Sequence, residues 1–220
     1  RALDLDALTA DHAGLGLARD RQGSRVEAGD QGERAQHGAA AGDPAQGWYS
    51  YEYAGWHVVV LNSNCAEAPA IGGCGDDSPQ ARWLRADLAA HPTRCALAYW
   101  HHPRFTSGQH GDSVAMTSLW SILEGAGVDV VLAGHEHDYE RLAPMRADGT
   151  LDEARGITSF VVGTGGTYLR TFATTHAHSL ARNELDHGVL RLSLHPDGFS
   201  WRFLPAAGGS YTDAGSMRCH

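Results

Sequence analysis

The feature that most constrains this chain is an aliphatic run that ends directly in two histidines. Residues 128–134 read VDVVLAG, a pattern typical of a buried strand, and His135 and His137 follow with one residue between them. In an extended or turning backbone, residues i and i+2 project to the same side. Because ligands of open α/β sheets commonly lie beyond the carboxyl ends of the strands, we expect both imidazoles to face one point there.

A second aliphatic run, upstream of the first, also ends in histidine. Residues 95–100 read CALAYW and lead into His101 and His102. The chain has 14 histidines, so one His-x-His pair is expected by chance, and a lone histidine is more often structural. Two strand ends that each deliver histidine favour a metal centre instead, since neutral imidazole binds Zn²⁺, Fe and Mn²⁺. The pattern predicts a metal-dependent hydrolase.

Four segments, in order, resemble those of purple acid phosphatases and related calcineurin-like metallophosphoesterases. Residues 134–141 (GHEHDYER) are similar to the family's Gly-His-x-His-x-Tyr-Glu-Arg segment, and residues 101–105 (HHPRF) to its His-x-Pro-x-aromatic segment. Residues 56–63 (WHVVVLNS) resemble an earlier strand, and residues 159–167 (SFVVGTGGT) a late strand with its glycine turn. The resemblance covers roughly residues 41–215.

The resemblance implies which residues carry the chemistry. His101 and His135 would bind one metal ion and His137 a second, and the metal pair would be Fe, Zn or Mn. His110 lies near the place of a histidine that contacts the substrate phosphate or protonates the leaving group, although its spacing from His101 is one residue short. The implied reaction is hydrolysis of small phosphate esters, as in acid phosphatases, by metal-activated hydroxide.

The chain departs from the family upstream of these segments. The family's Gly-Asp-x-Gly, Gly-Asp-x-x-Tyr and Gly-Asn-His-Asp/Glu motifs, which supply the remaining metal ligands, are absent. Without the bridging Asp, two cations would repel each other with little to offset the repulsion, so we expect impaired hydrolysis. The alternative is a non-catalytic remnant that binds one metal or a partner. Asp138 and Glu140 are expected either to orient imidazoles or to be exposed.

Composition divides the chain at about residue 40. Residues 1–40 are rich in Ala, Gly, Arg, Asp and Gln and contain scarcely any aromatic or β-branched residue, so they are predicted to be disordered or non-native. An out-of-frame translation and a natural linker are both compatible with this composition. Residues 41–220 are predicted to form the C-terminal part of a metallophosphoesterase domain, whose N-terminal half is missing.

Net charge and cysteine content indicate which classes of binding partner and which cellular compartment to expect. The net charge of −9 gives no electrostatic support for nucleic-acid binding, and no apolar run is long enough to span a membrane. Cys65 and Cys74 flank a glycine-bearing loop that can close a disulfide, which favours a secreted or extracytoplasmic protein. Cys95 is expected to be a small buried hydrophobe, and Cys219 has no assignment. The sequence gives no oligomeric state.

The remaining pattern predicts a mixed α/β fold. We expect helices over residues 78–90 and 114–125, the first with Ser78 as N-cap and Pro79 at its first position. Expected strands cover residues 49–53, 56–62, 97–100, 128–132, 158–162, 189–194 and 199–204. The family resemblance implies a sandwich of two mixed β-sheets flanked by helices. Missing strands would leave exposed edges and an uncovered apolar face.

Overall fold

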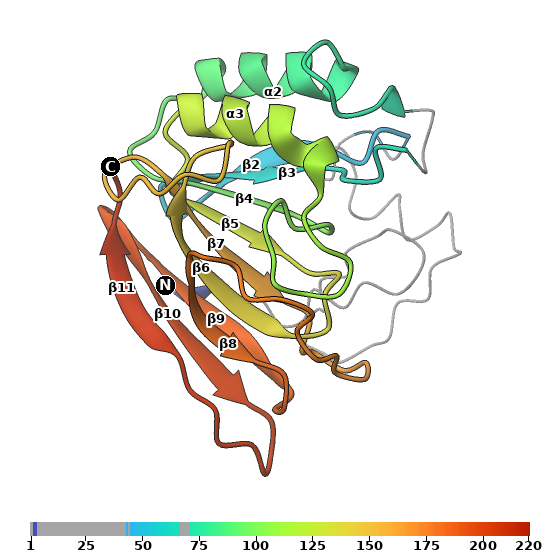
Figure 1. Cartoon of the computed structure of the whole chain (residues 1–220). Helices are drawn as coiled ribbons and strands as arrows, with labels where there is room; N and C mark the ends of the chain where they lie inside the picture. Colours follow the sequence, from blue (N-terminus) through green and yellow to red (C-terminus); the bar gives the residue numbers. More distant parts are fainter. Residues whose placement is uncertain (1, 4–42, 44, 67–70) are drawn as a thin grey trace, which may run out of the picture.

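The computed structural model describes residues 2–3, 43, 45–66 and 71–220. The predictions for residues 1–40 fall outside this part of the chain, except that Ala2–Leu3 form a short strand, β1. The rest of the described chain contains two sheets and two α-helices, which Figure 1 shows as layers.

The larger sheet has seven strands, and its centre is parallel. In spatial order the strands are β2 (Tyr49–Tyr53), β3 (Trp56–Val60), β4 (Ala96–Trp100), β5 (Val130–Ala133), β7 (Ile157–Val162), β6 (Tyr139–Met145) and β8 (Ser179–Asn183). Strands β3, β4, β5 and β7 run parallel to one another. At one side of this group β2 pairs antiparallel with β3, and at the other side β6 pairs antiparallel with both β7 and β8. The parallel centre brings four carboxyl ends to one edge of the sheet.

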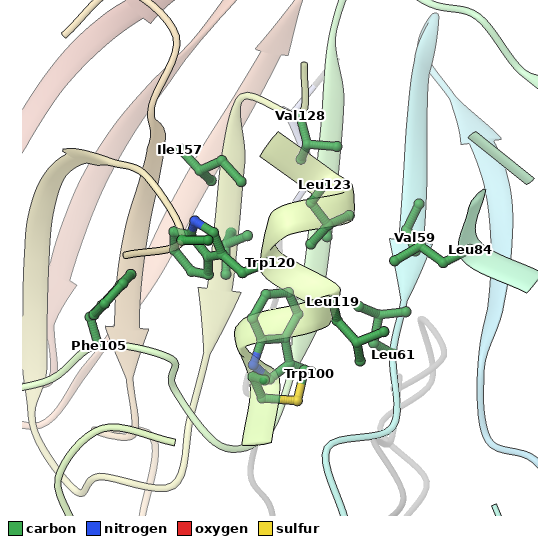
Figure 2. Close-up of a cluster of buried hydrophobic side chains, with 14 of the residues drawn as sticks. Val59, Leu61, Leu84, Trp100, Phe105, Leu119, Trp120, Leu123, Val128 and Ile157 are labelled. Carbon is green, nitrogen blue, oxygen red and sulfur yellow. The ribbon is translucent and has the colours of Figure 1, made fainter. Parts of the chain in front are cut away.

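Two helices cover one face of this sheet. Helix α2 (Pro79–Ala90) begins as predicted, because the Ser78 side chain accepts a hydrogen bond from the backbone N–H of Ala81. The second predicted helix divides into a 3₁₀ turn, η3 (Val114–Met116), and helix α3 (Thr117–Gly125). Figure 2 shows the core beneath them, in which Leu84 of α2 and Leu119, Trp120 and Leu123 of α3 meet side chains of the sheet.

A four-stranded sheet covers the other face. It consists of β1, β9 (Gly188–His195), β10 (Gly198–Pro205) and β11 (Ala214–Arg218), and all its pairs are antiparallel. Aromatic and leucine side chains of β9 and β10 pack on alternate residues of the large sheet: Val58, Leu97, Val130, Leu132 and Phe160. The prediction of two mixed sheets is therefore right for the large sheet and wrong for the small one.

The expected uncovered apolar face does not occur among the described residues. Both faces of the large sheet are covered, and β9 and β10 of the small sheet largely alternate between buried and more exposed residues. Arg191, Ser193 and Arg202 are among the side chains that alternate with its buried ones. This alternation lets an antiparallel sheet meet water on one side without exposing its apolar side chains.

Two disulfides cross-link this framework, one within a short loop and one between distant parts of the chain. Cys65–Cys74 forms as predicted. Cys95 is buried, but the expectation that it acts only as a small hydrophobe is wrong, because it is bonded to Cys219 across 124 residues. No helix in the described part of the chain is long and apolar enough to cross a membrane.

Candidate metal centre

The predicted histidines lie at the carboxyl ends of neighbouring parallel strands. Trp100 of β4 pairs with Ala133 of β5, so the residues that follow these two strands meet at the same sheet edge. The backbone N–H of Gly134 donates to the carbonyl oxygen of His101 at 3.0 Å and joins the two turns. As a result, His135 Nδ1 lies 3.0 Å from His101 Nε2.

Three imidazoles converge at this edge, and we call His101, His102 and His135 the histidine cluster. Ligand nitrogens of all three rings lie within 4.8 Å of one another. Ser63, after β3, fixes His102: its Oγ lies 2.9 Å from His102 Nδ1 and accepts from the His102 backbone N–H at 3.0 Å. His102 was not among the predicted ligands, although it directly follows His101 in the sequence.

His135 is the most constrained member of the cluster. Its φ of 66° lies in the left-handed region, which is rare for a residue with a Cβ and is often found at functional sites. Burial, together with the charges of His102, His101 and His110, lowers the pKa of His135 to about 3. The ring is therefore neutral at physiological pH, as a metal ligand must be.

His137 lies beside the cluster rather than within it. Its Nδ1 is 3.0 Å from the carbonyl oxygen of Tyr168, and its ring meets the Tyr168 ring edge-on at 5.0 Å. Burial, followed by the charge of Arg170, lowers its pKa. None of the three potential metal-binding groups in the described part of the chain includes His137.

His110, whose proposed role is to contact the substrate phosphate or protonate the leaving group, lies against the cluster. Its ring centroid is 4.3 Å from that of His135, and 43% of its side chain is exposed. Fully buried Glu136 holds it: Oε1 accepts from the His110 backbone N–H at 2.7 Å, and Oε2 lies 3.1 Å from His110 Nδ1. A Cβ at Gly108 would overlap the Glu136 carboxyl group, so this glycine makes the arrangement possible.

Arg170 adds a positive charge that sequence reasoning missed. Its Nη1 lies 3.2 Å from both ring nitrogens of His110, and its Nη2 donates to the Tyr168 hydroxyl at 2.9 Å. The Arg170 backbone N–H also donates to the carbonyl oxygen of His137. The only sequence signal for this arginine is its place shortly after the glycine turn at residues 163–167.

The carboxylates next to His137 face the interior. Asp138 and Glu140 are fully buried, so the alternative that they are exposed is wrong. Glu140 accepts hydrogen bonds from the backbone and hydroxyl of Ser107. Neither side-chain oxygen of Asp138 has a hydrogen-bond partner among the described residues, and burial, with repulsion from Glu136 and Glu140, raises the pKa of the Asp138 carboxyl group to about 8. Glu136, rather than Asp138 or Glu140, orients an imidazole.

Similarity to known proteins supports the resemblance that the motifs indicate. No family model matches the chain. Purple acid phosphatase 18 of Arabidopsis thaliana is 30% identical over 54% of this chain and 26% of its own length. Purple acid phosphatase 21 of the same plant is 36% identical over 44% of this chain and 22% of its own length. The chain thus spans about a quarter of these relatives.

Solved structures show the same fold at lower identity. Purple acid phosphatase PPD1 from yellow lupin (Lupinus luteus) seeds superposes with a TM-score of 0.66 and 18% identity, over 79% of this chain and 33% of that one. The structure titled PhoD gives a TM-score of 0.54 and 13% identity, over 78% of this chain and 41% of that one. Over part of its length, the chain is a distant homologue of purple acid phosphatases and has the fold of metallophosphoesterase structures.

Proposed function

We propose that the histidine cluster is the centre of a metal-dependent phosphate-ester hydrolase of acid-phosphatase type. The observation that carries the proposal is the convergence of three imidazoles at the carboxyl ends of β4 and β5. Homology to purple acid phosphatases supports the same chemistry. The substrate would be a small phosphate ester.

The donor set fits one metal ion. His101, His102 and His135 offer nitrogen ligands within 4.8 Å of one another, and a neutral imidazole suits Zn, Fe or Mn. A bound cation would supply a Lewis acid that activates water and offsets the charge on phosphate oxygens. We retain His137 as the proposed ligand of a second metal.

The residues around the cluster have separate proposed roles. His110 is exposed and lies beside His135, where it can donate a proton to a leaving alkoxide, and Glu136 fixes its orientation. Arg170 lies 3.2 Å from His110, and its guanidinium can bind phosphate oxygens in a forked geometry. These three residues would bind and orient the ester and move a proton.

We expect turnover to be slow. The group of ligands at the cluster contains three imidazoles and no carboxylate among the described residues, so a second cation would lack a bridging ligand. Losing the charge stabilisation of a second metal would slow hydrolysis by orders of magnitude. The same observation favours the second candidate function, a site that binds one metal without catalysing hydrolysis.

The test is turnover of an aryl phosphate by the 220-residue chain in the presence of Zn²⁺, Fe²⁺ or Mn²⁺. We expect weak, metal-dependent turnover that the His101→Ala/His135→Ala variant abolishes and His110→Ala reduces by about 10²–10⁴-fold. His195→Ala, which removes an exposed imidazole at the end of β9, is the matched control. Turnover that survives the double variant would refute the proposal, and metal binding without turnover would select the second candidate.

We also propose that the protein is secreted or extracytoplasmic. Two disulfides, one closing a short loop and one joining β4 to the C-terminal residues, are consistent with an oxidising compartment. Peptide mass spectrometry without reduction, after expression in the periplasm, should find both bonds. Free thiols at all four positions would remove this support.

A further inference from the structure

A second group of histidines and carboxylates lies at the opposite end of the sheet. His57 is at the amino end of β3, whereas the histidine cluster follows the carboxyl ends of β4 and β5. His57 is buried to 1% exposure, and its ring stacks on that of His91 at 4.8 Å with an interplanar angle of 13°. Ligand atoms of His57, Asp87 and His91 all lie within 4.8 Å of one another.

Both nitrogens of the buried His57 ring face carboxylates. Nδ1 lies 2.7 Å from Oε1 of Glu52, its cross-strand neighbour in β2, and Nε2 lies 2.7 Å from Oδ2 of Asp87 in α2. A neutral imidazole has one N–H and one lone pair, so it can donate to only one of these two oxygens. At 2.7 Å the second contact is also of hydrogen-bond length, so it requires a second proton on the ring, and a bound metal ion would replace that proton at Nε2.

The surroundings match the way proteins hold a zinc-binding histidine. Such a histidine presents one nitrogen to the metal and donates its other N–H to a carboxylate, which fixes the tautomer and ring orientation. Glu52 occupies that second position at His57 Nδ1. Ser50 Oγ donates to Asp87 Oδ1 at 2.6 Å, which orients this carboxylate and leaves Oδ2 directed toward His57 Nε2.

We infer that His57, Asp87 and His91 form a zinc site that is separate from the histidine cluster. His57 and Asp87 would provide buried ligands, and His91, at the C-cap of α2, an exposed one. Two nitrogens, one carboxylate oxygen and a water molecule would supply the four ligands that Zn²⁺ prefers, with the exposed His91 ring turning out of its stack on His57 to direct a nitrogen at the ion. The ion would join α2 to the β2–β3 hairpin, and this role does not depend on the proposed hydrolysis.

The experiment removes the histidine cluster by mutation, so that zinc binding at the second site can be measured alone. The His101→Ala/His135→Ala variant should still bind about one Zn²⁺ per chain in equilibrium dialysis followed by elemental analysis. Adding His91→Ala should weaken that binding at least 100-fold, because a directly bonded ligand is lost while an exposed residue is replaced. Adding Glu52→Ala should weaken it by about 10–100-fold, the usual effect of losing an outer carboxylate.

Two controls keep the inference falsifiable. His195→Ala in the same background should leave zinc affinity unchanged, because the ring of this exposed histidine contacts the Ser200 hydroxyl and belongs to none of the potential metal-binding groups among the described residues. If the double variant does not fold, His91→Ala in the unmodified chain should lower the zinc content by one equivalent. Zinc content that His91→Ala leaves unchanged, or a folded double variant that binds no zinc, would overturn the inference and leave a proton between His57 and its carboxylates.

Discussion

The two ends of the central parallel strands carry similar side chains in different environments. At the amino ends, polar groups are paired: buried Asp129 accepts hydrogen bonds from the backbone of Ala96 and His220, and His57 lies between two carboxylates. At the carboxyl ends, imidazoles face one another, and the described ligand group holds no carboxylate. The Asp138 carboxyl group, on the same side, has no hydrogen-bond partner in the described part of the chain.

The two ends of the sheet therefore differ in role: the amino ends stabilise the fold, and the carboxyl ends carry the candidate metal centre of the proposed hydrolase. Paired charges and the Cys95–Cys219 bond hold the amino ends of β3, β4 and β5 together. At the carboxyl ends, the low pKa of His135 keeps that ring neutral, and the imidazoles converge where open α/β sheets place their ligands. Changes at the amino ends should therefore alter stability and the inferred zinc site of His57, Asp87 and His91, and changes at the carboxyl ends should alter metal binding at the histidine cluster.

The largest expected effect comes from the disulfide at the amino ends. Replacing both Cys95 and Cys219 by Ser should lower the free energy of unfolding by about 5 kcal/mol, because the bond closes a loop of 124 residues. Removing Cys65–Cys74, whose cysteines are 9 residues apart, should lower it by roughly 2–3 kcal/mol. Urea unfolding of both variants tests whether the loss of Cys95–Cys219 lowers the free energy of unfolding more than the loss of Cys65–Cys74. Equal losses would contradict the special role of the amino ends.

A smaller loss should follow from Asp129→Asn. Asp129 Oδ2 accepts from the Ala96 backbone N–H at 2.9 Å, and Oδ1 lies 2.7 Å from His220 Nδ1. An amide can present only one oxygen, so one buried donor would lose its acceptor, which should lower the free energy of unfolding by about 2 kcal/mol. Zinc binding at the histidine cluster should remain. Simultaneous loss of zinc there would show that the two ends are coupled.

The smallest effect has the opposite sign. Asp138→Asn removes a buried carboxylate that has no hydrogen-bond partner among the described residues. An amide of the same shape avoids placing a charge there, so the free energy of unfolding of the metal-free protein should rise by about 1 kcal/mol at pH 8. Thermal or urea unfolding beside Asp129→Asn is the measurement. A loss comparable to that of Asp129→Asn would reveal a partner for Asp138.

Local patterns were sufficient to predict much of the fold. The aliphatic runs that form β3, β4 and β5 were identified within a few residues of their ends, and Ser78 with Pro79 marked the start of α2. Strand β6 was missed because its Glu140 and Arg141 resemble surface residues, although Glu140 is buried and hydrogen-bonded to Ser107. Its burial depends on tertiary contacts that local hydrophobicity does not record.

The site was predictable only where strand and histidine adjoin in the sequence. His101 and His135 were predicted to share a metal ion, and their rings lie together, with His110 against His135. His137 was expected to face the same point as His135, but it lies beside the cluster. Arg170 and Glu136 were missed because their contacts with His110 join residues 60 and 26 positions apart. Likewise, no local pattern indicates that Cys95 bonds to Cys219.

The central claim is that the carboxyl-end histidines bind a metal, and anomalous X-ray scattering from crystals of the zinc-loaded protein tests it most directly. The account predicts an anomalous peak bonded to His101, His102 and His135, whose ligand nitrogens already lie within 4.8 Å of one another. A matched crystal of the His101→Ala/His135→Ala variant should lack this peak. Absence of zinc from the histidine cluster at saturating zinc, with zinc bound elsewhere on the protein, would contradict the account.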